Sequence, residues 1–191
     1  MQVTHLGHAC LLVETDRARL LIDPGTLSHG FADQEDLDAV LITHEHADHV
    51  DAEAVRALVE KTGATLVVDE KTAVQFPQQA LTIARPGDVL DLGERVEVLG
   101  GIHAPVWGDI PGCPNLAYLV GDGELFHPGD SFTLPGREVG TLAVPIDGPW
   151  LKLGEAVDYV RAVAPATYLA IHEGELTDVS KYVGMLDALT P

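Results

Sequence analysis

One short run of histidines constrains this chain more than any other feature. The sequence Ala39-Val40-Leu41-Ile42-Thr43 is apolar and rich in β-branched residues, which predicts a buried strand, and the chain turns helical from Asp51. Between them stands His44-Glu45-His46-Ala47-Asp48-His49. Imidazole nitrogens and carboxylate oxygens are common ligands of zinc and iron. The sequence therefore predicts a metal-binding loop that joins a strand to a helix.

The spacing within this loop indicates how its ligands divide. His44 and His46 are two residues apart, so in an extended segment their side chains point the same way and can reach one ion. Asp48 and His49 follow where the chain bends toward the helix. They can therefore face a second ion instead of crowding the first.

Length and composition predict a globular protein. The 191 residues suit a single domain over residues 1–191, built from two tightly fused halves, and 46% of them are hydrophobic. No apolar run approaches the roughly 18 residues that a transmembrane helix needs. The start, Met1-Gln2-Val3-Thr4-His5, enters a strand pattern directly, without a basic region or an apolar targeting segment. We therefore expect a cytoplasmic protein.

Charge narrows the range of partners. The chain has 11 basic and 30 acidic residues, a formal charge of −19 that repels nucleic-acid backbones and anionic membranes. We therefore expect a small-molecule substrate and neither a nucleic-acid nor a membrane partner. Cys10 and Cys113 are far apart and form no C-x-x-C pair. We expect Cys10 in the core and Cys113 in a loop.

The alternation of strand and helix patterns predicts an α/β protein. Strands are expected over residues 5–8, 10–14, 19–22, 39–43, 65–69, 89–92, 95–99, 115–120, 124–127, 141–145 and 166–171. Helices are expected over 51–62, 70–76, 154–164 and 177–189. The strands form two sets, and we place the split between the two halves near residues 104–115.

Three more candidate ligands stand at the ends of predicted strands. His103 follows two glycines that let the backbone bend, and His172 ends the strand over 166–171. Asp130 follows the hairpin strand that ends at His127, and a carboxylate can bridge two cations through its two oxygens. On the residues alone, His103 is unremarkable and Asp130 fits an ordinary Gly-Asp-Ser turn.

Together these residues resemble the metallo-β-lactamase superfamily of hydrolases. His44–His49 matches its H-x-H-x-D-H signature, and the similarity continues through Gly7-His8-Ala9, Ile22-Asp23-Pro24, His103, Gly129-Asp130, Pro145-Ile146 and His172. Within the superfamily the chain is most similar to the compact branch related to ascorbate-6-phosphate lactonase, although Glu175 and Leu176 stand where close relatives carry a threonine. The resemblance implies a four-layer αββα sandwich, with two mixed β-sheets face to face and helices outside.

The resemblance also implies a role for each candidate residue. His44, His46 and His103 would hold one divalent metal ion, and Asp48, His49 and His172 a second. Asp130 would bridge the two ions, with Asp48 and Asp130 as the catalytic carboxylates. His8 and Asp23 would lie around the ligands and orient them. Zinc is the foremost metal for such a set, and manganese, iron or nickel also accept histidine and carboxylate ligands.

The activity implied is hydrolysis of an ester, lactone or phosphodiester bond in a small molecule by a metal-activated hydroxide. Asp130 weighs against a β-lactamase, because those relatives carry Cys or Ser at this position. Two alternatives remain open. One is a mononuclear iron persulfide dioxygenase, which metal counting would distinguish. The other is a non-catalytic metal-binding module, which a closed four-coordinate site would support.

Loops and the last helix supply the remaining candidates. Substrate contacts are expected from loop residues Trp107, Pro111, Trp150 and His29. The last predicted helix carries one apolar stripe, made of Val179, Tyr182, Val183 and Leu186. This stripe either completes the core or pairs two copies in a homo-oligomer.

Overall fold

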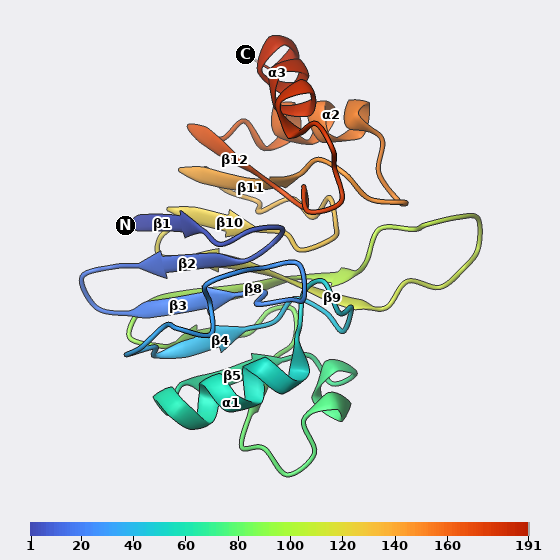
Figure 1. Ribbon diagram of the computed structural model, residues 1–191. Coiled ribbons are helices and arrows are strands. Elements are labelled where there is room, and N and C mark those ends of the chain that lie inside the picture. The colour runs from blue at the N-terminus through green and yellow to red at the C-terminus, as the bar shows by residue number, and fades with distance from the viewer. Residues whose placement is uncertain (191) are drawn as a thin grey trace.

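Two six-stranded β-sheets form the centre of the computed structural model, which describes residues 1–190 (Figure 1). In both sheets the strands are neighbours in their sequence order. The first sheet consists of β1 (Gln2–His5), β2 (Leu11–Glu14), β3 (Arg19–Ile22), β4 (Ala39–Leu41), β5 (Thr65–Val68) and β6 (Thr82–Ile83). The second consists of β7 (Val89–Asp91), β8 (Arg95–Ile102), β9 (Pro114–Val120), β10 (Leu125–His127), β11 (Thr141–Pro145) and β12 (Thr167–Ile171).

Both sheets are mixed. In the first, β1, β2 and β3 pair antiparallel, and β4, β5 and β6 continue parallel to β3. In the second, the strands from β7 to β10 pair antiparallel, and β11 and β12 are parallel to β10. The predicted α/β class with two mixed sheets is confirmed.

Helices cover the outer face of each sheet. α1 (Ala52–Thr62) packs on the first sheet, while α2 (Leu153–Val163) and α3 (Val179–Leu189) pack on the second, at opposite ends of the view in Figure 1. The carboxylate of Asp51 accepts the N–H of Ala54 and caps α1, and Gly63 ends it in the left-handed conformation. The segment expected as a helix over 70–76 is a short 3-10 helix, η1 (Thr72–Gln75).

Three apolar clusters fill the three interfaces of this αββα arrangement. The cluster between the sheets includes Leu11, Leu20, Ile22, Leu41, Val96 and Tyr118. Burying one such aliphatic side chain contributes on the order of 2 kcal/mol. In the outermost cluster Leu186 is buried, and Val179, Tyr182 and Val183 pack against the second sheet and α2. The apolar stripe of the last helix therefore completes the core.

The predicted split near residues 104–115 is wrong as a boundary between the two sheets. The chain changes sheets between Ile83 and Val89. Residues 103–113 form a loop that connects β8 and β9, which both belong to the second sheet. The β7–β8 hairpin alternates like a strand pair of either sheet, so its sequence pattern does not show which neighbour it joins. None of the helices within residues 1–190 is long and apolar enough to cross a membrane.

The strand ends position the candidate site. The loops that follow β4, β8, β10 and β12 carry His44–His49, His103, Asp130 and His172. The first of these strands belongs to one sheet and the other three to the second. The site is therefore assembled from both sheets. The loop after β8 extends away from the body of the protein, in yellow-green in Figure 1.

Candidate metal centre

The predicted ligands meet in two groups of donor atoms. The first group is His44, His46, His103 and Asp130, and the second is His8, Asp48, His49 and His172. Within each group the donor atoms lie within 4.8 Å of one another. The division of the histidine loop between two positions thus follows the predicted pattern, and His8 is an addition to the second group.

Asp130 lies between the two groups. Its Oδ2 is 3.2 Å from Nε2 of His103 and 3.2 Å from Nε2 of His172, while its Oδ1 is 3.1 Å from Nε2 of His49. Two ligands about 2.05 Å from a tetrahedral zinc ion are separated by about 3.3 Å. The spacing of these atoms therefore fits ligands that share a cation.

Asp23 fixes the orientation of two of the histidines. It is fully buried and accepts hydrogen bonds from the backbone N–H of Thr43, from the Thr43 hydroxyl and from Nδ1 of His49, each at 2.7 Å. Because the Thr43 hydroxyl gives its proton to Asp23, it can accept one from Nδ1 of His44, 3.0 Å away. Nε2 of both histidines is left as a lone-pair donor that faces the cluster.

Two other histidines are supported in the same manner. Nδ1 of His103 donates to the carbonyl oxygen of Ala104 at 2.6 Å, so its Nε2 carries a lone pair that can bind a metal. His46 is turned the other way: its Nδ1 lies 3.0 Å from Nε2 of His44, and its Nε2 lies 3.8 Å from Sγ of Cys113. Cys113 lies in the loop before β9, as expected, and it is buried against His46, a candidate ligand.

Several buried polar atoms at the centre have no hydrogen-bond partner within residues 1–190. They are Nε2 of His49, Nε2 of His172 and Oδ1 of Asp130. Leaving such atoms unpaired is costly in a folded protein. A divalent cation would satisfy all three, so the donor set fits a metal.

The electrostatics of the site also suit a cation. Burial alone would raise the pKa of Asp130, but His49, His103 and His172 hold it well below its usual range. Burial lowers the pKa of His44 well below 6.5, which keeps this imidazole neutral. Although burial opposes it, the neighbouring carboxylates of Asp130 and Asp48 raise the pKa of His172 to about 9. Ionised carboxylates thus draw positive charge into the centre.

His8 supports the second group from outside. Its Nδ1 accepts the backbone N–H of Gly174 at 3.1 Å, so its proton is on Nε2, which donates to Oδ2 of Asp48 at 3.1 Å. A protonated Nε2 has no lone pair for a metal. The turn around His8 is tied to the other end of the chain, because the His8 N–H donates to Glu173 and its carbonyl accepts the His172 N–H.

Backbone conformation at the site is unusual. His8, Asp23 and His172 have φ of 53°, 48° and 64°, in the left-handed region that side chains other than glycine seldom adopt. Gly129, at φ 59°, has no room for a side chain, because a Cβ there would lie 2.4 Å from Oδ1 of Asn115. Such strain persists only where surrounding contacts hold it in place.

Asn115 and Trp150 hold Asp130 itself. Oδ1 of Asn115 accepts the backbone N–H of Asp130 at 2.9 Å, and the indole N–H of Trp150 donates to its Oδ2 at 3.1 Å. No pattern in the sequence selects Asn115, Thr43 or Cys113 as supporting residues, because each reaches the site through strand pairing that no local motif encodes. Trp150 was expected to contact substrate, and it also hydrogen-bonds the bridging candidate.

A cleft of about 380 Å³ opens onto the two groups. It is lined by Thr26, Leu27, His46, Ala47, Asp48, His103, Val106, Asp130, Pro149, Trp150, His172 and Glu175. His46 is exposed on its open side, so the centre is accessible to a small molecule. Trp107 borders an adjoining hollow, whereas Pro111 and His29 line neither space. His127 is buried and makes only structural hydrogen bonds, to Ala9 and Gly129.

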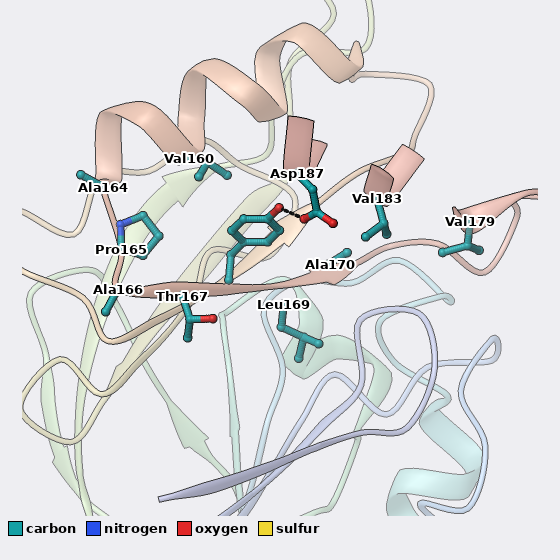
Figure 2. Close-up of a pocket in the computed structure, with 11 residues that line it drawn as sticks. Val160, Ala164, Pro165, Ala166, Thr167, Leu169, Ala170, Val179, Val183 and Asp187 are labelled. Carbon is teal, nitrogen blue, oxygen red and sulfur yellow. Dashed lines mark hydrogen bonds between the residues drawn. The ribbon is translucent and has the colours of Figure 1, made fainter. Parts of the chain in front are cut away.

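A separate hollow of about 570 Å³ between α2, α3 and β12 has a different character (Figure 2). Figure 2 shows a lining of mainly small and apolar side chains, with Asp187 as its carboxylate. Asp187 accepts a hydrogen bond from Tyr168. Neither donor group of the candidate metal centre reaches this hollow.

Comparisons with known proteins agree with this fold. Residues 2–172 match the family model described as the β-lactamase superfamily domain. Protein Rv0786c of Mycobacterium tuberculosis is 45% identical over 200 aligned positions, covering 100% of this chain and 93% of the relative. The UPF0173 metal-dependent hydrolase MK1542 of Methanopyrus kandleri is 30% identical over 95% of this chain and 87% of its own length. The solved structure of Igni18, described as a metallo hydrolase from Ignicoccus hospitalis, superimposes with a TM-score of 0.76 at 20% identity over 98% of this chain and 91% of Igni18.

Proposed function

Since the chain belongs to the β-lactamase superfamily and, within it, to the UPF0173 metal-dependent hydrolases, we propose that it hydrolyses an ester, lactone or phosphodiester bond in a small molecule. The observation that carries the proposal is the pair of donor groups joined by Asp130 at the bottom of an open cleft. A closed structural metal site would have no such opening. A non-catalytic module is therefore the weaker alternative.

We propose two divalent cations, with zinc as the first metal to test. His44, His46 and His103 would hold one, Asp48, His49 and His172 the other, and Asp130 both. Support comes from the shared position of Asp130 Oδ2, 3.2 Å from one histidine of each group. A mononuclear iron dioxygenase is not favoured, because it would leave one group without a role and the related MK1542 is described as a metal-dependent hydrolase.

The chain's own residues prepare the reaction. Bound divalent cations supply Lewis acidity, lower the pKa of water and polarise a substrate oxygen. Asp48 lies at the open side of the cleft, with its side chain 31% exposed, and His8 fixes the carboxylate through Oδ2. Asp48 is therefore placed to accept a proton from water and return it to the leaving oxygen. Trp150 fixes Asp130 and covers one wall of the cleft.

The test is metal analysis of protein purified without added metal, followed by an activity screen on lactones, phosphodiesters and thioesters. We expect close to two equivalents of metal and hydrolysis that a chelator abolishes. Asp130→Ala should lower the rate of hydrolysis at least about a hundredfold and lower the metal content, while its circular dichroism spectrum stays unchanged. Asp122→Ala, at an exposed turn, is the matched control. Unchanged turnover in Asp130→Ala would contradict the assignment.

A further inference from the structure

The loop between β8 and β9 exposes large apolar side chains beside the cleft. Trp107 is 76% exposed, Ile110 57% and Val106 50%, and Ile102 at the end of β8 is 68% exposed. Four large apolar side chains are thus exposed within residues 102–110, and Val106 among them lines the cleft. We call Ile102, Val106, Trp107 and Ile110 the apolar rim.

Two residues of the apolar rim, Val106 and Trp107, line the cleft or the hollow beside it. The cleft of about 380 Å³ and an adjoining hollow of about 340 Å³ share Val106, Pro149 and Trp150 as lining residues. Trp107 and Gly108 line the adjoining hollow but not the cleft. One groove therefore runs from Asp130 across the indole of Trp150 to Trp107.

The charges along the cleft disfavour an anionic substrate group beyond the metal centre. No Lys or Arg lines the cleft, whose charged side chains besides histidine are Asp48, Asp130 and Glu175. The adjoining hollow contains Lys152, but Glu155 stands beside it. Phosphate recognition normally uses arginine or lysine donors. A phosphate beyond the metal centre would find no basic partner in the cleft.

We infer that the groove binds the uncharged, apolar chain of a carboxylic ester or lactone, whose carbonyl group lies at the metal centre. This inference rests on the proposed function and selects one bond class within it. Water adds across the acyl C–O bond, which gives a carboxylic acid and an alcohol, or one hydroxy acid from a lactone. The chain lies along Val106 and Trp150 toward Trp107, where each buried methylene gains affinity.

The test uses the zinc-loaded protein with p-nitrophenyl acetate, butyrate, hexanoate and octanoate, and with bis-p-nitrophenyl phosphate as the anionic substrate. We expect kcat/KM to rise up to about threefold per added methylene along the ester series. The phosphodiester should be the poorest substrate. Trp107→Ala should reduce kcat/KM for the octanoate about tenfold and leave the acetate within twofold. Val89→Ala, which truncates an exposed side chain on β7 away from the groove, is the matched control.

A binding measurement separates this inference from the proposed function. Octanamide is an uncharged amide that should bind the wild-type protein and bind Trp107→Ala about tenfold more weakly in calorimetric titration, even if no ester is cleaved. Absence of all hydrolysis together with tight octanamide binding would therefore reject only the proposed function. Equal rates across the ester series, preference for the phosphodiester, or equal octanamide affinity in both proteins would overturn the inference. A wild-type dimer that Trp107→Ala converts to a monomer would overturn it as well, because the apolar rim would then pair two copies.

Discussion

The floor of the cleft and its apolar rim are built in opposite ways. The floor is the buried layer behind the residues that line the cleft. There Asp23, His44 and His49 are fully buried, and each is held by short hydrogen bonds to neighbouring side chains. On the rim, Trp107 and Ile110 expose most of their surface to solvent. The floor is thus fixed by contacts that few substitutions can satisfy, while the rim can change at little cost in stability. Under the proposed function, this contrast separates the residues that hold the metal from those that select the substrate.

The largest effect is expected for Asp23 on the floor. Asp23→Ala should lower the free energy of unfolding by about 3 kcal/mol, because it leaves the Thr43 N–H and Nδ1 of His49 buried without an acceptor. Urea denaturation with a chelator present measures this change in the metal-free protein. The exposed Asp33→Ala is the control. A loss below about 1 kcal/mol would mean that the floor is less tightly fixed than its hydrogen bonds indicate.

A smaller effect is expected at Cys113, which lies beside the exposed candidate ligand His46. Cys113→Ala removes the sulfur that lies 3.8 Å from Nε2 of His46, and we expect about tenfold weaker zinc binding. Cys113→Ser keeps a hydrogen-bond acceptor beside His46, so its zinc affinity should fall less than that of Cys113→Ala. Competition with a chromophoric chelator measures both affinities. Equal affinity in wild type and Cys113→Ala would show that His46 needs no support.

Trp150 belongs to both regions, so its substitution sharpens the comparison. Trp150→Phe removes the hydrogen bond to Asp130 but keeps an aromatic ring beside Phe132, whose centroid lies 5.6 Å away. Loss of one hydrogen bond, worth about 1 kcal/mol, should lower kcat about fivefold with little change in KM for the octanoate ester. A raised KM with unchanged kcat would instead place Trp150 wholly on the rim.

The smallest effect on stability is expected on the rim itself. Ile110→Ala should change the free energy of unfolding by less than about 0.5 kcal/mol, because its side chain is largely exposed. Urea denaturation of the metal-free protein measures it beside Asp23→Ala. A loss near 2 kcal/mol would show that the rim packs as firmly as the floor.

Much of the fold followed from hydrophobic periodicity. The helix over 51–62 was predicted with its cap and its stop, because Asp51 and Gly63 act through local hydrogen bonds and backbone preference. The two-residue strand β6 carries too little pattern to detect. The predicted boundary between the two sheets near residues 104–115 was wrong, because the alternation of residues along a strand does not encode which sheet a hairpin joins.

The candidate site could be predicted only where its chemistry is local. Ligands in the histidine loop stand within six residues, whereas the positions of His103, Asp130 and His172 came from the family resemblance. The supporting residues Cys113 and Asn115 reach the site through long-range pairing. One such pair is the bond from the Leu116 N–H to the Thr43 carbonyl. A linear sequence carries no local signal of that pairing.

The division of the candidate ligands between two sheets has a mechanical consequence. The histidine loop follows β4, while His103, Asp130 and His172 follow strands of the other sheet. An ion bound to both sets would hold the two sheets together. The free energy of metal binding adds to the stability of the folded state, because the complete site exists only in the folded protein. Removing the ion would therefore weaken the contact between the two sheets at the site and lower the stability of both.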